Sequence, residues 1–350
     1  MNIIPDLIFN VGILFVMLVP GIILKKCKLV PDGFGKGIAN LVLYVAQPVL
    51  IVSAYINCSS RFSDIWMNVL VVFVLSIIAH VIFSVVALLL FKKAPDKEKR
   101  MLRFVTIFAN AAFMGIPLIE AICGAEAAIY ASIYNITFNL FLWTLGVHLC
   151  TYKEGVDHDG DGDADITDAA ISYKNATKSE GSIIKVLLHP VTLASAIGFI
   201  LLATGANTAI VDTLNSTEPN IAIDFVVSCL NMLKALVAPL SMIIIGLRLA
   251  EVDFKGVWRD LNMHKFLLLR HLILPLILVG IIKLLTLIGV PISDTATVVT
   301  VILAATPAAS SATMFAEKYD CDAAYVSRLV AISTVLSIAS MPLVCMIAGI

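Results

Sequence analysis

The chain has 350 residues, of which 60% are hydrophobic and 14% charged, and its mean hydropathy is +0.98. Soluble proteins average ~45–50% apolar and ~25% charged residues, so this composition excludes an ordinary water-soluble protein and indicates a membrane protein. The 24 basic and 25 acidic residues give a net charge of -1, which leaves no basic excess for binding nucleic acid.

Ten runs are apolar and long enough to cross a bilayer as helices, because a hydrocarbon core of ~30 Å needs about 20 helical residues. Transmembrane strands are excluded, since they would appear as ~10-residue segments of alternating polarity. The sequence therefore predicts an all-α polytopic membrane protein with ten transmembrane helices. Numbered in chain order, the predicted spans cover 7–24, 38–56, 66–91, 104–122, 127–150, 184–203, 222–247, 266–288, 296–316 and 325–349.

The basic residues gather on one side of the predicted membrane. All but three of the 24 lysines and arginines lie in or beside the loops that follow the odd-numbered spans; the exceptions are Arg61, Lys234 and Lys283. Lys and Arg accumulate in cytoplasmic loops. We therefore expect both termini outside the cytoplasm, the 151–183 loop inside it, and a multi-pass location in the plasma (inner) membrane.

The two halves of the chain, 1–150 and 184–350, resemble each other. LYVAQPVLIVSA around Pro48 parallels ALVAPLSMIIIG around Pro239, and AEAAIYASIYNITFNL parallels CDAAYVSRLVAISTVL. Each half holds five spans, an odd number, so the second half must enter the membrane in the opposite sense. The sequence thus predicts two inverted five-helix repeats.

Spans 4 and 9 are poor continuous helices. Proline lacks an N–H and its ring clashes with the carbonyl four residues back, and freed backbone groups at this depth must face protein or a watery cavity. Interrupted spans at matching places in two repeats predict a substrate site near the midplane, where half-helix N-termini suit an anion. Simple kinking or packing is the alternative, and we favour it for Pro48 and Pro239. The interrupting residues are Asn110, Gly115 and Pro117 in span 4, and Thr306, Pro307, Ser310 and Ser311 in span 9.

With these motifs the chain resembles the auxin efflux carrier family of bacterial and plant transporters over nearly its whole length. GIILKKCKLVPDGFGKGIANLVLYVAQPVLIVSA is similar to the first two spans of that family, and NAAFMGIPL is close to its span 4 signature. AATPAASSATMFAEKYDCDAA resembles the bacterial form of span 9. Plant members have Gln after the span 9 proline and a second proline five positions beyond it, where this chain has Ala308 and Ala312.

The resemblance implies crossed, broken helices 4 and 9. It also implies an elevator movement of a transport domain, spans 3–5 and 8–10, against a scaffold of spans 1, 2, 6 and 7. Asn110 would line the substrate site, and Pro117 and Pro307 would mark the crossover. Substrates would be small organic anions such as indole acetate, malate or malonate, and the protein would form a homodimer.

Five further polar residues within predicted spans are candidates for a role in transport. Asn135 and Asn139 share one face of span 5 at i, i+4 spacing, and Gln47 adds an amide in span 2. These amides can line the site, although interhelical hydrogen bonding needs no ligand and is the simpler role. Lys234 in span 7 can attract an anionic substrate or extend its ammonium group to the interface, and Glu120 can couple protons or lie at the interface.

Residues 151–183 form a polar loop that contains the run DHDGDGDADITD. Its aspartates follow the spacing of a calcium-binding loop, with Gly162 at the position of the sharp turn. A solvated acidic linker without bound metal is the alternative. We expect transport itself to require no cofactor. The predicted Ca²⁺ ligands are Asp157, Asp159, Asp161, Asp165, Asp168 and the backbone carbonyl of Asp163.

Motifs of other functional classes are absent from the sequence. There is no Gly-x-x-x-x-Gly-Lys-Ser/Thr loop for ATP, no His-Glu-x-x-His and no Gly-x-Ser-x-Gly, and the seven cysteines are scattered. An enzyme is therefore not expected. The sequence predicts a secondary carrier for a small organic anion in the lipid bilayer, and a channel or membrane receptor that uses the same broken helices is the alternative.

Overall fold

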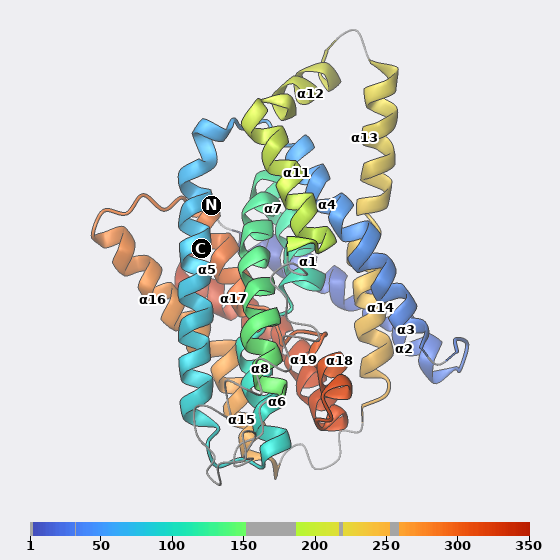
Figure 1. The fold of residues 1–350 in the computed structure, drawn as a ribbon, viewed down its shortest axis with the longest axis vertical. Coiled ribbons are helices and arrows are strands. Elements are labelled where there is room, and N and C mark those ends of the chain that lie inside the picture. Colours follow the sequence, from blue (N-terminus) through green and yellow to red (C-terminus); the bar gives the residue numbers. More distant parts are fainter. Residues whose placement is uncertain (1–2, 32, 152–186, 217–219, 253–258) are drawn as a thin grey trace, which may run out of the picture.

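The computed structural model describes residues 3–31, 33–151, 187–216, 220–252 and 259–350, and these fold into helices joined by short connections (Figure 1). The predicted calcium loop, 157–168, lies outside the described residues. Helices are the expected form for an apolar chain in a bilayer, because each helix satisfies its own backbone hydrogen bonds.

The helices of the two halves follow one another in chain order, and η marks a π-helical turn. The first half contains α1 (Ile4–Val16), α2 (Leu18–Lys26), α3 (Phe34–Leu41), η1 (Val42–Ala46), α4 (Gln47–Ile56), α5 (Phe62–Leu90), α6 (Asp96–Ile107), η2 (Ala111–Gly115), α7 (Ile116–Phe141), η3 (Leu142–Gly146) and α8 (Val147–Thr151). The second half contains α11 (Pro190–Thr204), α12 (Ala206–Leu214), α13 (Ile221–Lys234), α14 (Val237–Leu249), α15 (Leu261–Leu268), η5 (Leu269–Ile273), α16 (Leu274–Leu287), α17 (Asp294–Ala305), α18 (Ala312–Lys318) and α19 (Ala323–Ala348).

Three of the π-turns directly precede a helix with a proline in its first turn. η1 precedes Pro48, η2 precedes Pro117 and η5 precedes Pro275. Proline provides no N–H, and its ring pushes away the carbonyl four residues back. The wider π-turn accommodates the ring, so the helix continues through the proline instead of ending there.

The described residues contain seven helices that are long and apolar enough to cross a membrane, and the bent pair α11 and α12, with an angle of 80°, makes an eighth. The all-α class is therefore confirmed for the described residues, and the apolar helices agree with a polytopic membrane protein, whereas ten spans and inverted repeats stay predictions. The lower number arises where helices are bent or broken. Predicted spans 4 and 5 share the 111–151 stretch, which bends at Gly124, and predicted span 9 is divided between α17 and α18.

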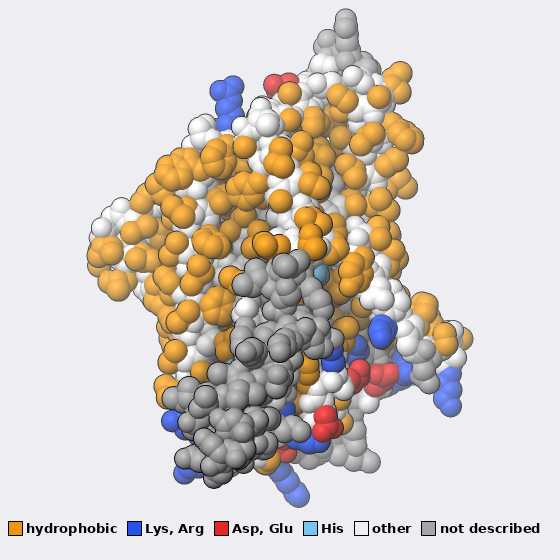
Figure 2. Space-filling view, viewed as in Figure 1, with side chains coloured by type: hydrophobic (Ala, Val, Ile, Leu, Met, Phe, Trp, Pro, Cys, Tyr) orange, Lys and Arg blue, Asp and Glu red, His pale blue; other side chains and the backbone are white. Residues whose placement is uncertain are grey.

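Side chains on the outer surface are suited to lipid. Figure 2 shows hydrophobic side chains over much of the upper part of the face, and most of the visible Lys and Arg side chains at the lower end. Phe225 on α13 is 69% exposed and Leu284 on α16 is 58% exposed, as expected for residues that face hydrocarbon. Ile3, Gly349 and Ile350 line one small cavity, so the two ends of the described chain lie together.

Close helix packing joins spans 1 and 7. A Cβ atom on Gly246 of α14 would overlap the carbonyl oxygen of Leu18 and would lie 3.2 Å from the Cα of Gly21 in α2. A Cβ atom on Gly21 would in turn overlap the carbonyl oxygen of Ile243. Small residues of this kind let membrane helices approach at backbone distance. Two further helices, α11 and α13, both pack on α4 of predicted span 2.

The Gly246→Ala substitution should therefore destabilise the protein by about 1 kcal/mol or more, because the obstacle is backbone that cannot rotate away. The matched control is Gly280→Ala on α16, where an added Cβ meets no atom within 4 Å. Alanine there should be neutral or stabilising, because it favours the helix. Melting temperatures in detergent measure both, and equal shifts would contradict the close packing.

Candidate functional site

The helix is interrupted within predicted span 4 and again within predicted span 9. Residues 108–110 separate α6 from η2, and residues 306–311 separate α17 from α18. The sequence predicted an interruption in each of these two spans, and the structure has both. Pro307 lies in the second break itself, whereas Pro117 lies in the first turn of α7, where a helix tolerates proline.

The two breaks bind each other through their backbones. The N–H of Asn110 donates to the carbonyl oxygen of Pro307 at 2.7 Å, and the N–H of Ala309 donates to that of Phe108 at 2.9 Å. These bonds form an antiparallel bridge centred on Ala109 and Ala308. Backbone groups that leave a helix inside a membrane need such partners, so the pairing explains how both breaks are tolerated.

Gly115 brings the two broken helices together. A Cβ atom at this position would lie 2.5 Å from Cδ2 of Leu303 and 3.4 Å from Cγ2 of Thr306, both of which belong to span 9. A larger residue would therefore force the Leu303 side chain out of its present position between α17 and the start of α7. Gly115, Thr306, Pro117 and Pro307 thus shape the crossing.

A buried arginine caps the ends of both helices that enter the breaks. Nε and Nη2 of Arg270 donate to the carbonyl oxygen of Thr306 at 3.2 and 2.9 Å, and Nη1 donates to that of Thr106 at 3.3 Å. Thr306 follows α17, and Thr106 lies in the last turn of α6. The last carbonyls of a helix have no partner inside the helix, so the guanidinium group satisfies both ends.

The neighbouring histidine supports the second break. The N–H of Ala308 donates to the hydroxyl oxygen of Ser333 at 2.9 Å, and that oxygen lies 2.8 Å from Nε2 of His271. Nδ1 of His271 lies 2.8 Å from the hydroxyl of Ser340. Both serines belong to α19, so this chain of contacts ties the break to α19 and to the η5 turn.

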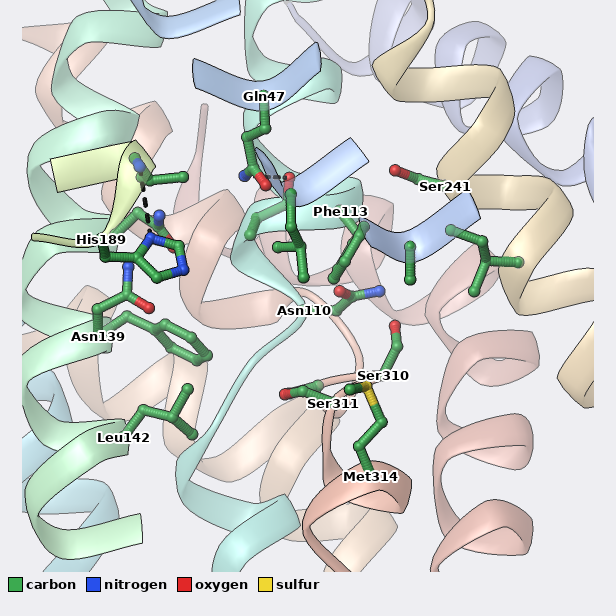
Figure 3. Close-up of a pocket in the computed structure, with 18 of the residues that line it drawn as sticks. Gln47, Asn110, Phe113, Asn139, Leu142, His189, Ser241, Ser310, Ser311 and Met314 are labelled. Carbon is green, nitrogen blue, oxygen red and sulfur yellow. Dashed lines mark hydrogen bonds between the residues drawn. The ribbon is translucent and has the colours of Figure 1, made fainter. Parts of the chain in front are cut away.

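A cavity of ≈ 220 Å³ lies beside the two breaks. Figure 3 shows Asn110 among its lining residues, with Phe113 nearby and with Ser310 and Ser311 of the second break on the side of Met314. Both helices that start after the breaks, η2–α7 and α18, contribute to the wall. Helix starts expose unpaired N–H groups and carry partial positive charge, which favours a negatively charged ligand.

Several polar atoms on this wall are buried and have no hydrogen-bond partner among the described residues. Buried polar groups in proteins are nearly always paired, so a cluster of unpaired ones points to a ligand or ordered water. The set includes a donor, two acceptors and two hydroxyl groups. They are Nδ2 of Asn110, Oε1 of Gln47, Oδ1 of Asn135, and Oγ of Ser241 and Ser310.

The rest of the wall is apolar and aromatic, and it carries one formal charge. Phe138, Trp143 and Phe315 supply aromatic surface, and the charged residue is Arg248 of α14. Within the part of the chain that the structure describes, the Arg248 side chain makes no hydrogen bond or ion pair, and no carboxylate lines the cavity. An unpaired guanidinium group beside unpaired polar atoms is suited to bind a carboxylate.

A second, wider cavity of ≈ 720 Å³ adjoins the first and shares Trp143, Arg248 and Phe315 with it. Four basic residues, Lys25, Lys36, Arg248 and Lys318, and two acidic residues, Glu251 and Glu317, line this outer part, and Lys25 forms an ion pair with Glu251 at 2.6 Å. Partial burial lowers the pKa of Lys318 from the usual lysine value. The two cavities together connect the breaks with a basic vestibule.

The structure brings most of the predicted site residues together. Gln47, Asn110, Asn135, Asn139, Ser310 and Ser311 line the first cavity. Lys234 lies elsewhere, because its Nζ forms an ion pair with Oε1 of Glu120 at 2.7 Å, and it does not line the cavity. The side chains of Lys234 and Glu120 are 24% and 18% exposed, so the ammonium group of Lys234 is held by Glu120, away from this cavity.

Sequence reasoning missed Arg248, Arg270, His271 and Ser241. It counted both arginines among the cytoplasmic basic residues, although Arg270 falls inside predicted span 8. An ionisable residue within an apolar run usually has a functional role, and that signal could have identified Arg270. Ser241 and Arg248 could not be identified from the sequence, because only the structure shows that their helix, α14, lies beside the breaks.

The family of the chain follows from comparison with known proteins. Residues 7–345 match a family model described as "Membrane transport protein". The chain belongs to this family. It is also 27% identical over 332 residues to an uncharacterized transporter of Methanothermobacter thermautotrophicus, with 94% of each chain covered. The resemblance to auxin efflux carriers is thereby confirmed, and the protein is a membrane transporter.

The membership of this transporter family assigns no substrate, and it does not support an enzymatic role. Among the described residues, no group of three or more His, Cys, Asp or Glu side chains is arranged to hold a metal ion. The calcium hypothesis concerns 157–168, outside the described residues, and stays a hypothesis.

Proposed function

We propose that this transporter carries a small organic anion, which binds in the cavity beside the two breaks. The observation that carries the proposal is the cluster of unpaired polar atoms on the cavity wall, next to the unpaired guanidinium group of Arg248. Aromatic side chains on the wall of the same cavity suit a ligand with an apolar body. Asn110 would donate to the ligand, and Gln47 and Asn135 would accept from a hydroxyl or N–H group on it.

The position of the cavity supports an elevator mechanism. Its wall combines residues of predicted spans 2, 6 and 7, such as Gln47, His189 and Ser241, with residues of spans 4, 5 and 9. In the proposed division into a scaffold and a transport domain, the ligand thus lies at the boundary between them. We propose ten spans in two inverted five-helix repeats, with 1–150 and 184–350 as the repeats. The homodimer stays a prediction.

The vestibule supports an inward-facing state. Lys25, Lys36 and Lys318 line it with two glutamates, so basic residues are in excess, and an excess of Lys and Arg marks the cytoplasmic side of membrane proteins. We place this end in the cytoplasm, the chain in the plasma (inner) membrane, and both termini outside. In this arrangement the substrate would enter or leave the described state through the vestibule, on the same side as the 151–183 loop.

The proposal is tested by a thermal-shift screen of the purified protein against carboxylic acids, each paired with its neutral amide. A ligand that binds only the folded state raises the melting temperature. We expect acids to stabilise and their amides to do so less. Counterflow in liposomes with the best acid then separates a carrier from a channel, because only a carrier gives saturable exchange. Equal shifts by acids and amides would contradict an anion site.

The ion pair between Lys234 and Glu120 gives a test of the elevator movement. Lys234 lies on predicted span 7 of the scaffold and Glu120 on span 4 of the transport domain, so the pair must break when the domains slide. Glu120→Gln removes the charge but keeps the shape. Because a partly exposed pair contributes ~0.2–1 kcal/mol, we expect the counterflow rate at saturating substrate to change about 2- to 5-fold.

The matched control for Glu120→Gln is Asp320→Asn. Its ion pair with Lys97 joins two parts of the proposed transport domain, at 3.0 Å, and is not required to break. Asparagine also tolerates the positive φ of 53° at this position. Its counterflow rate should match the wild type. Equal effects of the two substitutions would argue against a sliding boundary between Lys234 and Glu120.

A further inference from the structure

The side chain of Arg270 is an unusual element of the crossing, because it is a charged group in the middle of the fold with 0% of its surface exposed. It extends from the π-turn η5, and its guanidinium carbon lies 5.5 Å from the centre of the Phe83 ring. Within the described residues, the Arg270 side chain donates its hydrogen bonds to the backbone carbonyls of Thr106 and Thr306 and none to a carboxylate.

The surroundings of this charge explain how it is stabilised. A buried charge without a counter-ion is costly in a membrane protein. Here two helices of 12 residues each, α6 and α17, end at the carbonyls that Arg270 binds. The C-terminal end of a helix carries a partial negative charge, so two such ends together act as the counter-charge. The ring face of Phe83 adds a cation–π contact.

The same two helix ends are a place where an inorganic cation would otherwise bind. In transporters with broken helices, unwound backbone carbonyls and half-helix C-termini coordinate the coupling ion, such as Na⁺. In this chain the guanidinium group of Arg270 already occupies those carbonyls. A sodium ion would have to displace it from the oxygens of Thr106 and Thr306 and would then lie beside a fixed positive charge.

We propose that Arg270 is a built-in cation of the crossing, which takes the place of a coupling ion and makes transport by this protein independent of sodium. The inference goes beyond the proposed function, because it holds for any substrate in the cavity. Arg270 acts as a positioning residue: it holds the C-terminal ends of α6 and α17 together and thereby fixes the two breaks that line the cavity.

The first test uses the wild-type protein and needs no substrate. Its melting temperature is measured in equal concentrations of sodium chloride, potassium chloride and choline chloride. We expect the three values to agree within about 1 °C, because no cation binds at the crossing. A rise of about 2 °C or more that is specific to sodium would mean that a sodium ion binds the folded state, and it would overturn the proposal.

The second test uses Arg270→Ala, which should leave an empty cation site lined by carbonyls. We expect a lower melting temperature, and a recovery of about 2 °C or more on addition of sodium or of low-millimolar guanidinium, far below denaturing concentrations. Arg328→Ala is the control, because Arg328 stacks on Tyr325 of α19 and not at the crossing. It should show no recovery. A folded Arg270→Ala protein that responds to neither cation would overturn the proposal.

If Arg270→Ala does not fold, Arg270→Lys keeps the test decisive. Lysine retains a positive charge but cannot bind two carbonyl groups with a planar fork. We expect a folded protein with a lower melting temperature and still no stabilisation that is specific to sodium. A sodium-dependent rise in Arg270→Lys would show that the carbonyls accept sodium beside a positive charge, and it would contradict the role of Arg270 as the cation.

Discussion

Substitution of Arg248 by glutamine should weaken the binding of a carboxylate ligand by about 10- to 100-fold. Hydrogen bonds to a charged group contribute ~1.5–3 kcal/mol, and this guanidinium group is the charged side chain on the cavity wall. Because the Arg248 side chain makes no hydrogen bond or ion pair with another described residue, its replacement breaks no internal polar contact. The loss should therefore appear in ligand affinity and not in the stability of the unliganded protein.

Titration calorimetry with the best carboxylate from the thermal-shift screen measures this effect. Arg248→Lys should recover part of the affinity, because it restores the charge without the bidentate geometry. Lys36→Gln is the matched control: Lys36 is exposed in the outer vestibule, where water and salt screen its charge, so its loss should change affinity less than about 2-fold. Equal losses of affinity in the two variants would indicate a general electrostatic attraction of the anion, and not a direct contact between Arg248 and the carboxylate.

The neutral amide of the same ligand provides a second comparison. If Arg248 binds the carboxylate, the wild type should prefer the acid over the amide, and Arg248→Gln should lose most of this preference. Comparison of two proteins, wild type and Arg248→Gln, with two ligands, acid and amide, forms a double-mutant cycle. The cycle isolates the contact between Arg248 and the carboxylate. Retention of the full preference in Arg248→Gln would place the carboxylate elsewhere, for example at the helix starts beside Asn110 and Ser310.

The helical architecture and the two breaks could be predicted from the sequence because both depend on local chemistry. Continuous apolar runs require helices in lipid, and Pro307 and the glycine and proline of span 4 interrupt them. The exact helix count was harder to predict. Gly124, with φ 80°, bends the chain without a polar loop, and α12 turns away from α11 after Gly205, so hydropathy alone does not define where one span ends.

The candidate site was predictable only in part. Asn110, Ser310 and Ser311 lie in the breaks and could be chosen from the motif, and all three line the cavity. Arg248 and Lys234 show why the rest could not. Both are basic residues on the same pair of helices, α13 and α14, yet one faces the cavity and the other pairs with Glu120 across a tertiary contact. Spacing along one chain does not reveal which face meets a partner from another helix.

Substitution of Asn110 by alanine should weaken ligand binding by about 5- to 10-fold while leaving the protein at least as stable. The crossing uses the backbone N–H of Asn110, which donates to Pro307, and alanine keeps that bond. The side chain is different: its Nδ2 is buried, with 2% of the residue exposed, and has no partner in the described structure. An unpaired buried donor costs ~1–3 kcal/mol, and a hydrogen bond to the ligand would recover part of that.

The two readouts for Asn110→Ala should therefore move in opposite directions. Without ligand, its melting temperature should equal or exceed that of the wild type, because the unpaired donor is gone. With saturating carboxylate, the ligand-induced rise should be smaller than in the wild type. Asn57→Ala is the control, since Asn57 bonds to Ser53 and Asn231 away from the cavity, and it should lower stability without changing affinity. If unliganded Asn110→Ala is less stable and its affinity is unchanged, the amide has a packing role. Removal of a donor that serves only to bind the ligand should instead stabilise the free protein and weaken ligand binding at the same time.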